Sequence, residues 1–420
     1  MRLTVATYGS EGDTRPFVAL CRGLVDAGHD VKLFAEQSSV HIAHAHGIAV
    51  EPLAGDIKAT LPLDNPAQEL STREIIRIVK KGLRGVNDNI KSWMSAITAH
   101  ARTADAIFYA GFACPASQAI AEELEMPAIG LWLQPTTPTR EFGSSALPPW
   151  RLPGWLNRFS YRASPEAMIR RLYGKSSEAA RGNLFGNARR VRKNCDFPIL
   201  YGFSRHIVAS PRDWPDSHRI CGHWPLPTGD WQAPEDLLEF LSGGPPPIYV
   251  GFGAASSFVR QKKLTEIVSA IGGRRALFYP GWSKITSSML PKNFFVVGDT
   301  PHARLFPLTS MVIHHGGAGT THTASRAGVP SIVLPFGGDQ SFWAARLASA
   351  GVAPPRVRPG KWDRQSLAQM IEFAEHDLVR ERAKMLGVAM ADENGITAAV
   401  KEIEAVAVPS RTRNDISENY

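Results

Sequence analysis

Residues 311–340, MVIHHGGAGTTHTASRAGVPSIVLPFGGDQ, contain the pattern that decides the fold. The apolar residues Met311–Ile313 predict a short strand that runs into the glycine-rich turn His314–Gly319. A helix over about 319–327 and a second strand over 331–336 are expected to follow. This succession of strand, glycine-rich turn, helix and strand is typical of a parallel α/β sheet.

The glycine-rich turn suits a phosphorylated ligand. Glycines let a ligand approach the backbone, and the first turn of a helix offers free N–H groups with about half a positive charge, so a diphosphate fits here. His315 would add a hydrogen-bond donor, and Thr320 and Thr321 would add hydroxyls. An ordinary glycine-rich turn with a histidine that caps it explains the same pattern.

The alternation of strands and helices continues on both sides of this stretch. The other segments expected to be strands are 3–8, 31–36, 48–53, 105–110, 127–133, 206–209, 247–253, 275–281 and 294–299. We expect two parallel-sheet domains over 1–215 and 246–405, joined by a linker over 216–245 and followed by a polar tail over 406–420. Ligands at the carboxyl ends of the two sheets would face one another across a cleft.

The composition is that of a globular protein, with 420 residues of which 44% are hydrophobic and 20% charged. No apolar run approaches the roughly 18 residues of a membrane span, and the N-terminus predicts a strand rather than an export signal, so we expect a cytoplasmic protein. The four cysteines, Cys21, Cys114, Cys195 and Cys221, include no CxxC pair and are expected to be reduced core residues.

The net charge of +8 is concentrated in one segment, residues 151–195, which carries 11 lysines and arginines against two acidic residues. Combined with Trp150, Trp155, Phe159 and Tyr161, this excess is typical of a surface that contacts an anionic membrane at headgroup depth. A solvated basic face over an ordinary core explains it equally well. No known DNA- or RNA-binding module accompanies the charge, so nucleic acid is not an expected partner.

The stretch 311–340 resembles the nucleotide-sugar signature of family 1 glycosyltransferases, specifically the bacterial branch that includes glycopeptide and macrolide enzymes and the sterol glucosyltransferases. Residues 9–20, GSEGDTRPFVAL, resemble the first loop of their N-terminal domain. Further similar segments, in the expected order, are TPTREF (137–142), LPGWLNRFSYR (152–162), LYGFS (200–204), DWPD (213–216) and GDTPHARLF (298–306). The middle segments are most similar to the sterol- and lipid-glucosylating members.

The resemblance implies a GT-B fold, an α/β architecture of two facing Rossmann-like domains that binds the nucleotide sugar mainly in the C-terminal domain. His315 would meet the diphosphate, and Asp339 with Gln340 would hold sugar hydroxyls, although this pair also suits the start of a helix. The residues implied to bind the donor are His315, Gly317, Gly319, Thr320, Thr321, Asp339, Gln340, Trp282, His302 and Ser256.

The acceptor would bind in the N-terminal domain, where its candidate contacts are Trp132, Gln134, Phe142 and Trp150. By the resemblance, Asp13 matches the general base of the family. A carboxylate just after the first strand lies at the cleft, where it could take the proton of an acceptor hydroxyl. A purely structural role as the cap of the first helix remains open for this residue.

The sequence departs from the family pattern at two positions. Thr323 stands where many plant members carry an acid that holds the ribose hydroxyls, which leaves uridine and thymidine donors both open. Ala254 stands where relatives commonly have a serine, so Ser256 or Ser257 would reach a phosphate instead.

No metal or cofactor is expected. The sequence contains no DxD motif, so the helix dipole and His315 would stabilise the leaving group without a divalent cation. The spacing of His41, His44 and His46 fits no common metal site.

These observations predict an inverting glycosyltransferase that moves glucose from UDP-glucose to the hydroxyl of a hydrophobic acceptor such as a sterol, lipid or polyketide. A deoxysugar transferase is the alternative within the class. A dinucleotide-dependent oxidoreductase is a rival because Glu36 ends the second strand where an acid would hold a ribose, but neither GSEG (9–12) nor GFGAAS (251–256) completes G-x-G-x-x-G. A non-catalytic lipid-binding protein is the third possibility.

Overall fold

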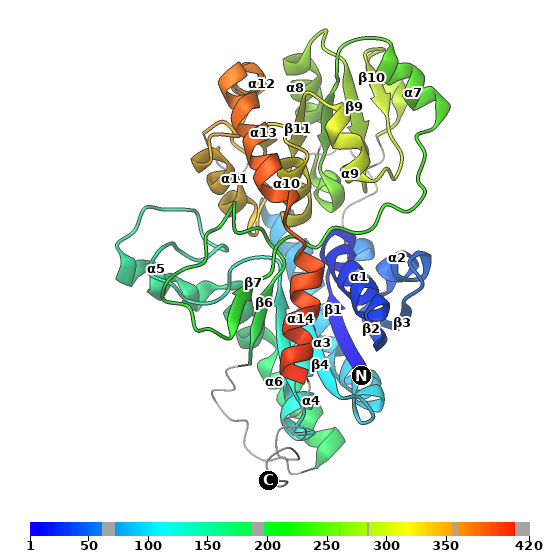
Figure 1. Cartoon of the computed structure of the whole chain (residues 1–420), viewed down its shortest axis with the longest axis vertical. Coiled ribbons are helices and arrows are strands. Elements are labelled where there is room, and N and C mark those ends of the chain that lie inside the picture. Colours follow the sequence, from blue (N-terminus) through cyan, green and yellow to red (C-terminus); the bar gives the residue numbers. More distant parts are fainter. Residues whose placement is uncertain (61–71, 187–196, 260, 284, 356–359, 408–420) are drawn as a thin grey trace, which may run out of the picture.

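The computed structural model describes residues 1–60, 72–186, 197–259, 261–283, 285–355 and 360–407, which form two α/β units stacked along the long axis (Figure 1). Seven parallel strands form the first sheet in the order β3-β2-β1-β4-β5-β6-β7. Their bounds are Arg2–Tyr8 (β1), Asp30–Glu36 (β2), Ala49–Leu53 (β3), Ala106–Gly111 (β4), Ala128–Trp132 (β5), Ile199–Tyr201 (β6) and His218–Ile220 (β7).

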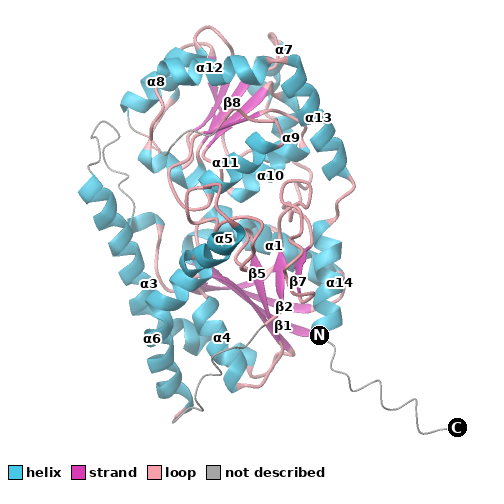
Figure 2. Cartoon of the chain, turned by 90° about the vertical axis from the view of Figure 1, so that its left-hand side faces the viewer, coloured by secondary structure: helices cyan, strands magenta, loops and turns pink. Residues whose placement is uncertain are grey.

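Helices cover both faces of this sheet, so its central strands are buried on both sides, as is usual for parallel sheets. One face packs mainly against α3, α4 and α6, and the other against α1, α2 and α14 (Figure 2). The helices along this part of the chain are α1 (Glu11–Asp26), α2 (Val40–Ala45), α3 (Thr72–Ala101), α4 (Cys114–Glu123), α5 (Gly154–Ser160), α6 (Pro165–Phe185) and α7 (Glu235–Ser242), with 3-10 turns η1 (Gln37–Ser39), η2 (Lys58–Thr60) and η3 (Tyr161–Ala163).

The second sheet has five parallel strands in the order β10-β9-β8-β11-β12. The strands are β8 (Ile248–Gly251), β9 (Ala276–Tyr279), β10 (Phe294–Val296), β11 (Met311–His314) and β12 (Ser331–Val333). The remaining helices are α8 (Gln261–Ile271), α9 (His302–Leu305), α10 (Ala318–Arg326), α11 (Gln340–Ser349), α12 (Arg364–Glu375), α13 (Asp377–Ala391) and α14 (Gly395–Ala407), with 3-10 turns η4 (Gly253–Phe258), η5 (Ser287–Met289) and η6 (Phe306–Leu308).

Both sheets reverse their strand order next to their first strand, because β1 lies beside β4 and β8 beside β11. Ligands of such sheets bind at the carboxyl ends of the strands at this switch point. The loop with Asp13 follows β1, and the turn with His315 follows β11. The predicted pair of Rossmann-like domains is therefore confirmed, and the two predicted site regions both occupy switch points.

The predicted strand over 206–209 is wrong. Ile207 and Val208 are buried, but their N–H groups donate to the carbonyl of Ser204 in a turn. Burial without sheet pairing produces the same apolar pattern as a short strand. The first sheet ends instead with β6 and β7, and β7 falls inside the segment predicted as a linker.

The last helix, α14, lies on the first unit although it follows the second in sequence (Figure 1). Ala399 and Ile403 are fully buried in the core formed by α1 and the first sheet. At the helix surface, His29 Nε2 lies 3.0 Å from Glu404 Oε1. The sequence predicted this helix as the end of the second domain, because its apolar face indicates burial but not the partner.

Some predictions lie outside the described residues, namely those on Cys195 and the rest of 187–196, and on the tail beyond residue 407. Cys21, Cys114 and Cys221 are free and buried, as predicted. Tyr161 is buried, contrary to its predicted place on the basic surface. None of the described helices is long and apolar enough to cross a bilayer.

Candidate active site

The glycine-rich turn after β11 positions His315 at the start of α10. Gly316 has φ +93°, and a Cβ there would lie 2.6 Å from Val333 Cγ1, so only glycine fits. Gly317 is the N-cap of α10, and a Cβ there would lie 2.6 Å from His315 Nε2. The two glycines thus leave room for the imidazole beside the free N–H groups of the helix.

The polar groups at this turn are neutral. Burial lowers the pKa of His315 to about 4, so the ring is uncharged at neutral pH. Among the described residues, His315 Nδ1 and the buried hydroxyls of Thr321 and Ser256 have no hydrogen-bond partner. Unpaired buried polar atoms cost stability unless a ligand or water satisfies them. His315 and Thr321 lie at the N-terminal end of α10, and a Cβ at Gly253 of η4, the turn that carries Ser256, would lie 3.5 Å from the His315 ring, an arrangement that suits an anion site.

The two serines of η4 differ in their contacts. Ser257 Oγ donates to the carbonyl of Ala254 (3.0 Å), whereas Ser256 is the unpartnered one. A Cβ at Gly281, in the loop after β9, would lie 2.8 Å from Ser256 Oγ. Of the two candidates, Ser256 is therefore the hydroxyl available to a phosphate.

Asp339 and Gln340 open helix α11. Asp339 is its N-cap residue, but its side chain makes no capping hydrogen bond. Instead, Asp339 Oδ2 accepts from the indole N–H of Trp343 (2.6 Å). Gln340 Oε1 accepts from the backbone N–H groups of Phe336 and Gly337, which leaves its amide N–H groups as donors. A carboxylate oxygen and an amide donor thus stand side by side.

The remaining donor candidates lie around the loops after β8, β9 and β10. His302 Nε2 lies 2.9 Å from Tyr249 Oη, and its ring stacks on Phe306. Burial lowers the pKa of His302 to about 4. Trp282 is 9% exposed, and Lys58 Nζ of the first unit lies 5.6 Å from the centre of its ring.

Thr320 and Thr323 carry two of the hydroxyls in the first turns of α10. Thr320 is half-buried, and Gly319 has open space where a side chain would begin. Thr323, the residue that replaces the ribose-binding acid of plant relatives, donates its hydroxyl to the Gly319 carbonyl (2.8 Å). That hydroxyl is therefore already engaged within the helix.

Asp13 faces this site from the first unit. Ser10 is the N-cap of α1, and Asp13 stands at the third helical position, where its Oδ2 accepts from the Ser10 N–H (2.8 Å) and hydroxyl (2.9 Å). Solvent reaches the side chain, yet surrounding protein desolvates the carboxylate and raises its pKa, against the effect of the Ser10 hydrogen bonds. Its charge also raises the pKa of Asp339, so the two carboxylates are close enough to interact electrostatically.

The four acceptor candidates do not form one cluster. Trp132 is buried at the end of β5 with its indole N–H unpartnered, and Gln134 is half-buried just beyond it. Phe142 contacts the second unit, with Arg346 4.4 Å from its ring centre. Trp150 is 54% exposed on the outer surface. Trp132 and Gln134 lie two residues apart at the carboxyl end of the first sheet, and Phe142 packs against the same hydrophobic core as Trp132.

Two observations bear on the other sequence hypotheses. The buried Glu36 carboxylate accepts from the N–H groups of Ser38 and Ile57, so it fixes its own loop and is not free to hold a ribose. Among the described residues, no three His, Cys, Asp or Glu side chains form a metal-binding group.

The sequence did not identify Trp343 or Arg15. Trp343 lies four residues after Asp339, the spacing that brings two side chains together on a helix. Arg15 pairs with Asp299 across the cleft, a contact between residues far apart in sequence that no local pattern indicates.

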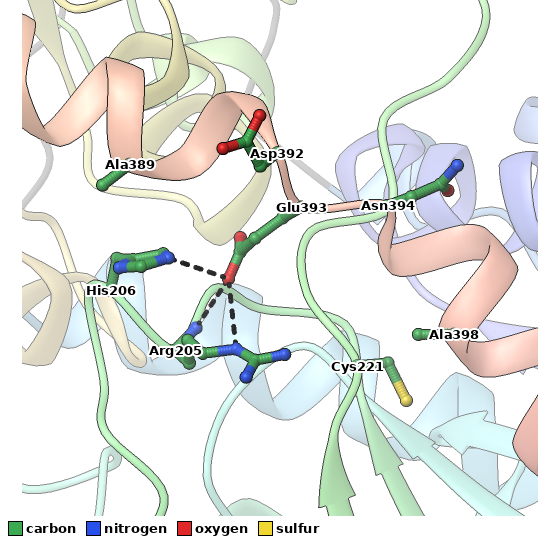
Figure 3. A pocket seen from close by; sticks show the side chains of 8 residues that line it. All are labelled: Arg205, His206, Cys221, Ala389, Asp392, Glu393, Asn394 and Ala398. Carbon is green, nitrogen blue, oxygen red and sulfur yellow. Dashed lines mark hydrogen bonds and ion pairs between the residues drawn. The ribbon is translucent and has the colours of Figure 1, made fainter.

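A separate cavity of about 300 Å³ lies at the turn between α13 and α14 (Figure 3). Its main polar contact joins Glu393 Oε1 to the backbone N–H of Arg205 (3.2 Å), with His206 Nε2 3.9 Å away. None of the predicted site residues lines it. These contacts hold the turn between α13 and α14, where the chain returns from the second unit to the first, against the first unit.

Two segments of the chain match known domain families. Residues 3–142 match the glycosyltransferase family 28 N-terminal domain, and residues 277–406 match the erythromycin biosynthesis protein CIII-like C-terminal domain.

The chain is also similar to curated proteins along nearly its whole length. It is 29% identical to a sterol 3-beta-glucosyltransferase of Neurospora crassa, covering 96% of this chain and 27% of the relative. It is 29% identical to one of Arabidopsis thaliana, covering 96% and 65%. The chain thus spans between about a quarter and two thirds of the length of these relatives.

Solved structures share the fold. The glycosyltransferase of kitacinnamycin superposes with a TM-score of 0.65 at 17% identity, covering 97% of this chain and 99% of that one. The spinosyn rhamnosyltransferase gives 0.64 at 18% identity, covering 96% and 100%. The two facing units therefore have the GT-B arrangement.

Proposed function

We infer that the chain belongs to the GT-B glycosyltransferases of the family 1 type, because a family 28 N-terminal domain and an EryCIII-like C-terminal domain combine here in a GT-B fold. We propose that it transfers glucose from UDP-glucose, with inversion, to the hydroxyl of a hydrophobic acceptor such as a sterol, lipid or polyketide. This proposal is supported by the electrostatic proximity of Asp13, after β1, to Asp339, and by the glycine-rich turn with His315 after β11.

The proposed reaction is a single displacement. The Asp13 carboxylate takes the proton of the acceptor hydroxyl while the acceptor oxygen forms its bond to the anomeric carbon. The bond from that carbon to the diphosphate oxygen breaks on the opposite face, which inverts the configuration. UDP leaves against the N–H groups of α10 and the neutral His315, which stabilise its charge by hydrogen bonding and the helix dipole.

Asp339 and Gln340 orient the sugar in this proposal. The Asp339 carboxylate, fixed by Trp343, accepts from one hydroxyl, and the Gln340 amide donates to its neighbour. Sterol acceptors are favoured because the similar proteins of Neurospora crassa and Arabidopsis thaliana are sterol 3-beta-glucosyltransferases, and Trp132 with Gln134 are the contacts best placed for a sterol.

The test is mass spectrometry of products after incubation with a panel of nucleotide sugars and a mixed set of sterols, lipids and polyphenols. We expect a hexose added to a hydrophobic acceptor with UDP-glucose, and none with Asp13→Asn. A deoxysugar product from a thymidine donor would show that the donor is a thymidine diphosphate deoxysugar and not UDP-glucose. Tight acceptor binding without any product, with no nucleotide bound, would favour the lipid-binding alternative.

We further propose that the acceptor arrives from an anionic membrane. In the described part of the basic segment, Trp155 and Phe159 on α5 are 67% and 55% exposed, and Arg162 lies 4.4 Å from the Phe159 ring centre. Other exposed apolar residues nearby are Trp150, Met168 and Leu172. Exposed rings enter the headgroup layer while the arginines attract anionic lipid. Helix α5 projects from the side of the molecule (Figure 1).

Vesicle sedimentation tests this surface. We expect the protein to bind vesicles with anionic lipid at low salt and to leave them at high salt, because salt screens charges beyond about 8 to 10 Å. Trp155→Ser with Phe159→Ser should abolish binding. The matched control is Met385→Ser with Val388→Ser, two residues of similar exposure on α13. Equal binding to neutral and anionic vesicles would show that lipid charge does not contribute, and the basic segment would then be only a solvated face.

A metal-free reaction is part of the proposal. Since the helix N-terminus and neutral donors replace a cation at the diphosphate, EDTA should leave the transfer rate within about twofold of the untreated rate. Loss of most activity on chelation, restored by magnesium or manganese, would show that a divalent cation is needed.

A further inference from the structure

Among the residues that the structure describes, those predicted to bind the diphosphate in the second unit carry no formal positive charge. His315 and His302 are neutral, and Ser256, Thr320 and Thr321 offer only hydroxyls. The nearby carboxylates of Asp13 and Asp339 add negative charge. A nucleoside diphosphate carries about two negative charges, and the end of a helix offers only about half a positive one.

Arg15 brings a cation to this site from the facing unit. It lies on α1 two residues after Asp13, and α1 packs against η4, the turn that carries Ser256. Its guanidinium Nη2 donates to both oxygens of Asp299, at 3.2 and 3.1 Å, in the loop after β10. Arg15 and His315 both act electrostatically on His302, so both lie within electrostatic reach of that ring.

The Arg15–Asp299 pair is suited to exchange. The Asp299 side chain is 69% exposed and that of Arg15 34%, so the pair is held weakly against water. A guanidinium can donate two parallel hydrogen bonds to the oxygens of a phosphate, whereas both oxygens of Asp299 accept from the single Nη2 atom of Arg15.

We propose, on the basis of the proposed function, that Arg15 helps to bind and position the donor. When the donor enters, the guanidinium leaves Asp299 and donates instead to an oxygen of the diphosphate. In the absence of the donor, Asp299 keeps the guanidinium at the mouth of the site. Because the cation comes from the first unit, donor binding also holds α1, and with it Asp13, against the second unit.

Calorimetric titration of UDP and of uridine separates this role from a structural one. Arg15→Gln should weaken UDP binding about 10- to 100-fold, the range for a lost charge-assisted hydrogen bond, and leave uridine binding unchanged. Arg15→Lys should recover part of the loss. Asp299→Asn should keep or raise UDP affinity, because it removes the carboxylate that competes with the diphosphate and leaves Arg15, among the described residues, only its 3.5 Å contact with Glu11. Arg22→Gln, on the same helix but paired with Asp26, is the matched control and should bind UDP normally.

Salt gives a second readout. UDP affinity of the wild type should fall with ionic strength more steeply than that of Arg15→Gln. Equal UDP affinity in wild type and Arg15→Gln, or equal losses of UDP and uridine binding, would overturn the proposal for Arg15. Failure of the wild type to bind any nucleoside diphosphate would instead overturn the proposed function, and the role of Arg15 with it.

Discussion

At the scale of single residues, Asp13 illustrates how one side chain serves structure and chemistry together. Both hydrogen bonds from Ser10 reach the same oxygen, Oδ2. Oδ1, unpaired among the described residues, is left to take a proton. The structural role at the start of α1 that the sequence left open is therefore real, but it uses only half of the carboxylate.

Asp13→Asn tests whether the carboxylate also acts as the general base. The amide oxygen can still accept from Ser10, so we expect the thermal midpoint to change little, while the transfer rate falls roughly 10²–10⁴-fold because no base accepts the proton. The measurement is the initial rate and the midpoint on one preparation. A normal rate would show that Asp13 is not the general base. If the thermal midpoint of Asp13→Asn falls sharply, Asp13→Glu serves as the second variant.

Asp339 predicts a pH dependence of donor binding. Burial raises its pKa to about 6, the charge of Asp13 adds to this rise, and the Trp343 hydrogen bond opposes it. Protonation removes an acceptor for the sugar hydroxyl, so the KM for the donor should rise as pH falls below about 6. Trp343→Phe removes the opposing hydrogen bond, so its KM should begin to rise at higher pH. A KM that is constant between pH 5 and 7 would contradict this role.

At the scale of elements, the turn from β11 into α10 is the most constrained part of the site. Gly317 has φ −62°, which any residue can adopt, so its lack of a side chain matters only for the space that His315 occupies.

Gly317→Ala should therefore displace the imidazole without unfolding the helix. The added Cβ would lie 2.6 Å from His315 Nε2, so we expect UDP affinity to fall about tenfold, in line with one lost hydrogen bond, at a nearly unchanged midpoint. Gly273→Ala, where the Cβ meets nothing within 4 Å, controls for the substitution itself. Unchanged UDP affinity in Gly317→Ala would show that the ring position is unimportant.

The sequence predicted the elements whose pattern is local. Strand β11, the glycine-rich turn and α10 lie where the residues indicate, because glycine geometry and helix periodicity act over a few neighbours. The strand predicted at 206–209 failed because burial alone produced its apolar pattern. The fixing of Asp339 by Trp343 and the pairing of Arg15 with Asp299 depend on tertiary packing, which no local pattern contains.

At the scale of the whole molecule, neutral buried histidines make stability depend on pH. Burial lowers the pKa of His314 to about 3 and that of His322 to about 4, and both side chains are completely buried. The unfolded chain binds these protons near pH 6.5, whereas the folded chain does not, so folding stability is full above pH 6.5 and is lost as pH falls toward 4.

We expect the free energy of unfolding to decrease by up to about 1.4 kcal/mol per pH unit for each such histidine in this window. Urea titrations between pH 7.5 and 4.5 measure this slope. His322→Gln should reduce this slope by the contribution of one histidine. The fold should persist, since glutamine can still donate to the Ala318 carbonyl as His322 Nδ1 does (2.7 Å). A slope equal to that of the wild type would show that His322 is not buried as a neutral ring.

The position of α14 has a consequence for synthesis on the ribosome. The core beside α1 contains Ala399 and Ile403, which are translated after both sheets. A nascent chain that has completed the first sheet therefore still exposes the apolar surface that α14 will cover, and must keep it from aggregating while the second unit is made. The unit that begins the chain is therefore the last to be finished, after every element of the second unit up to α13 has been translated.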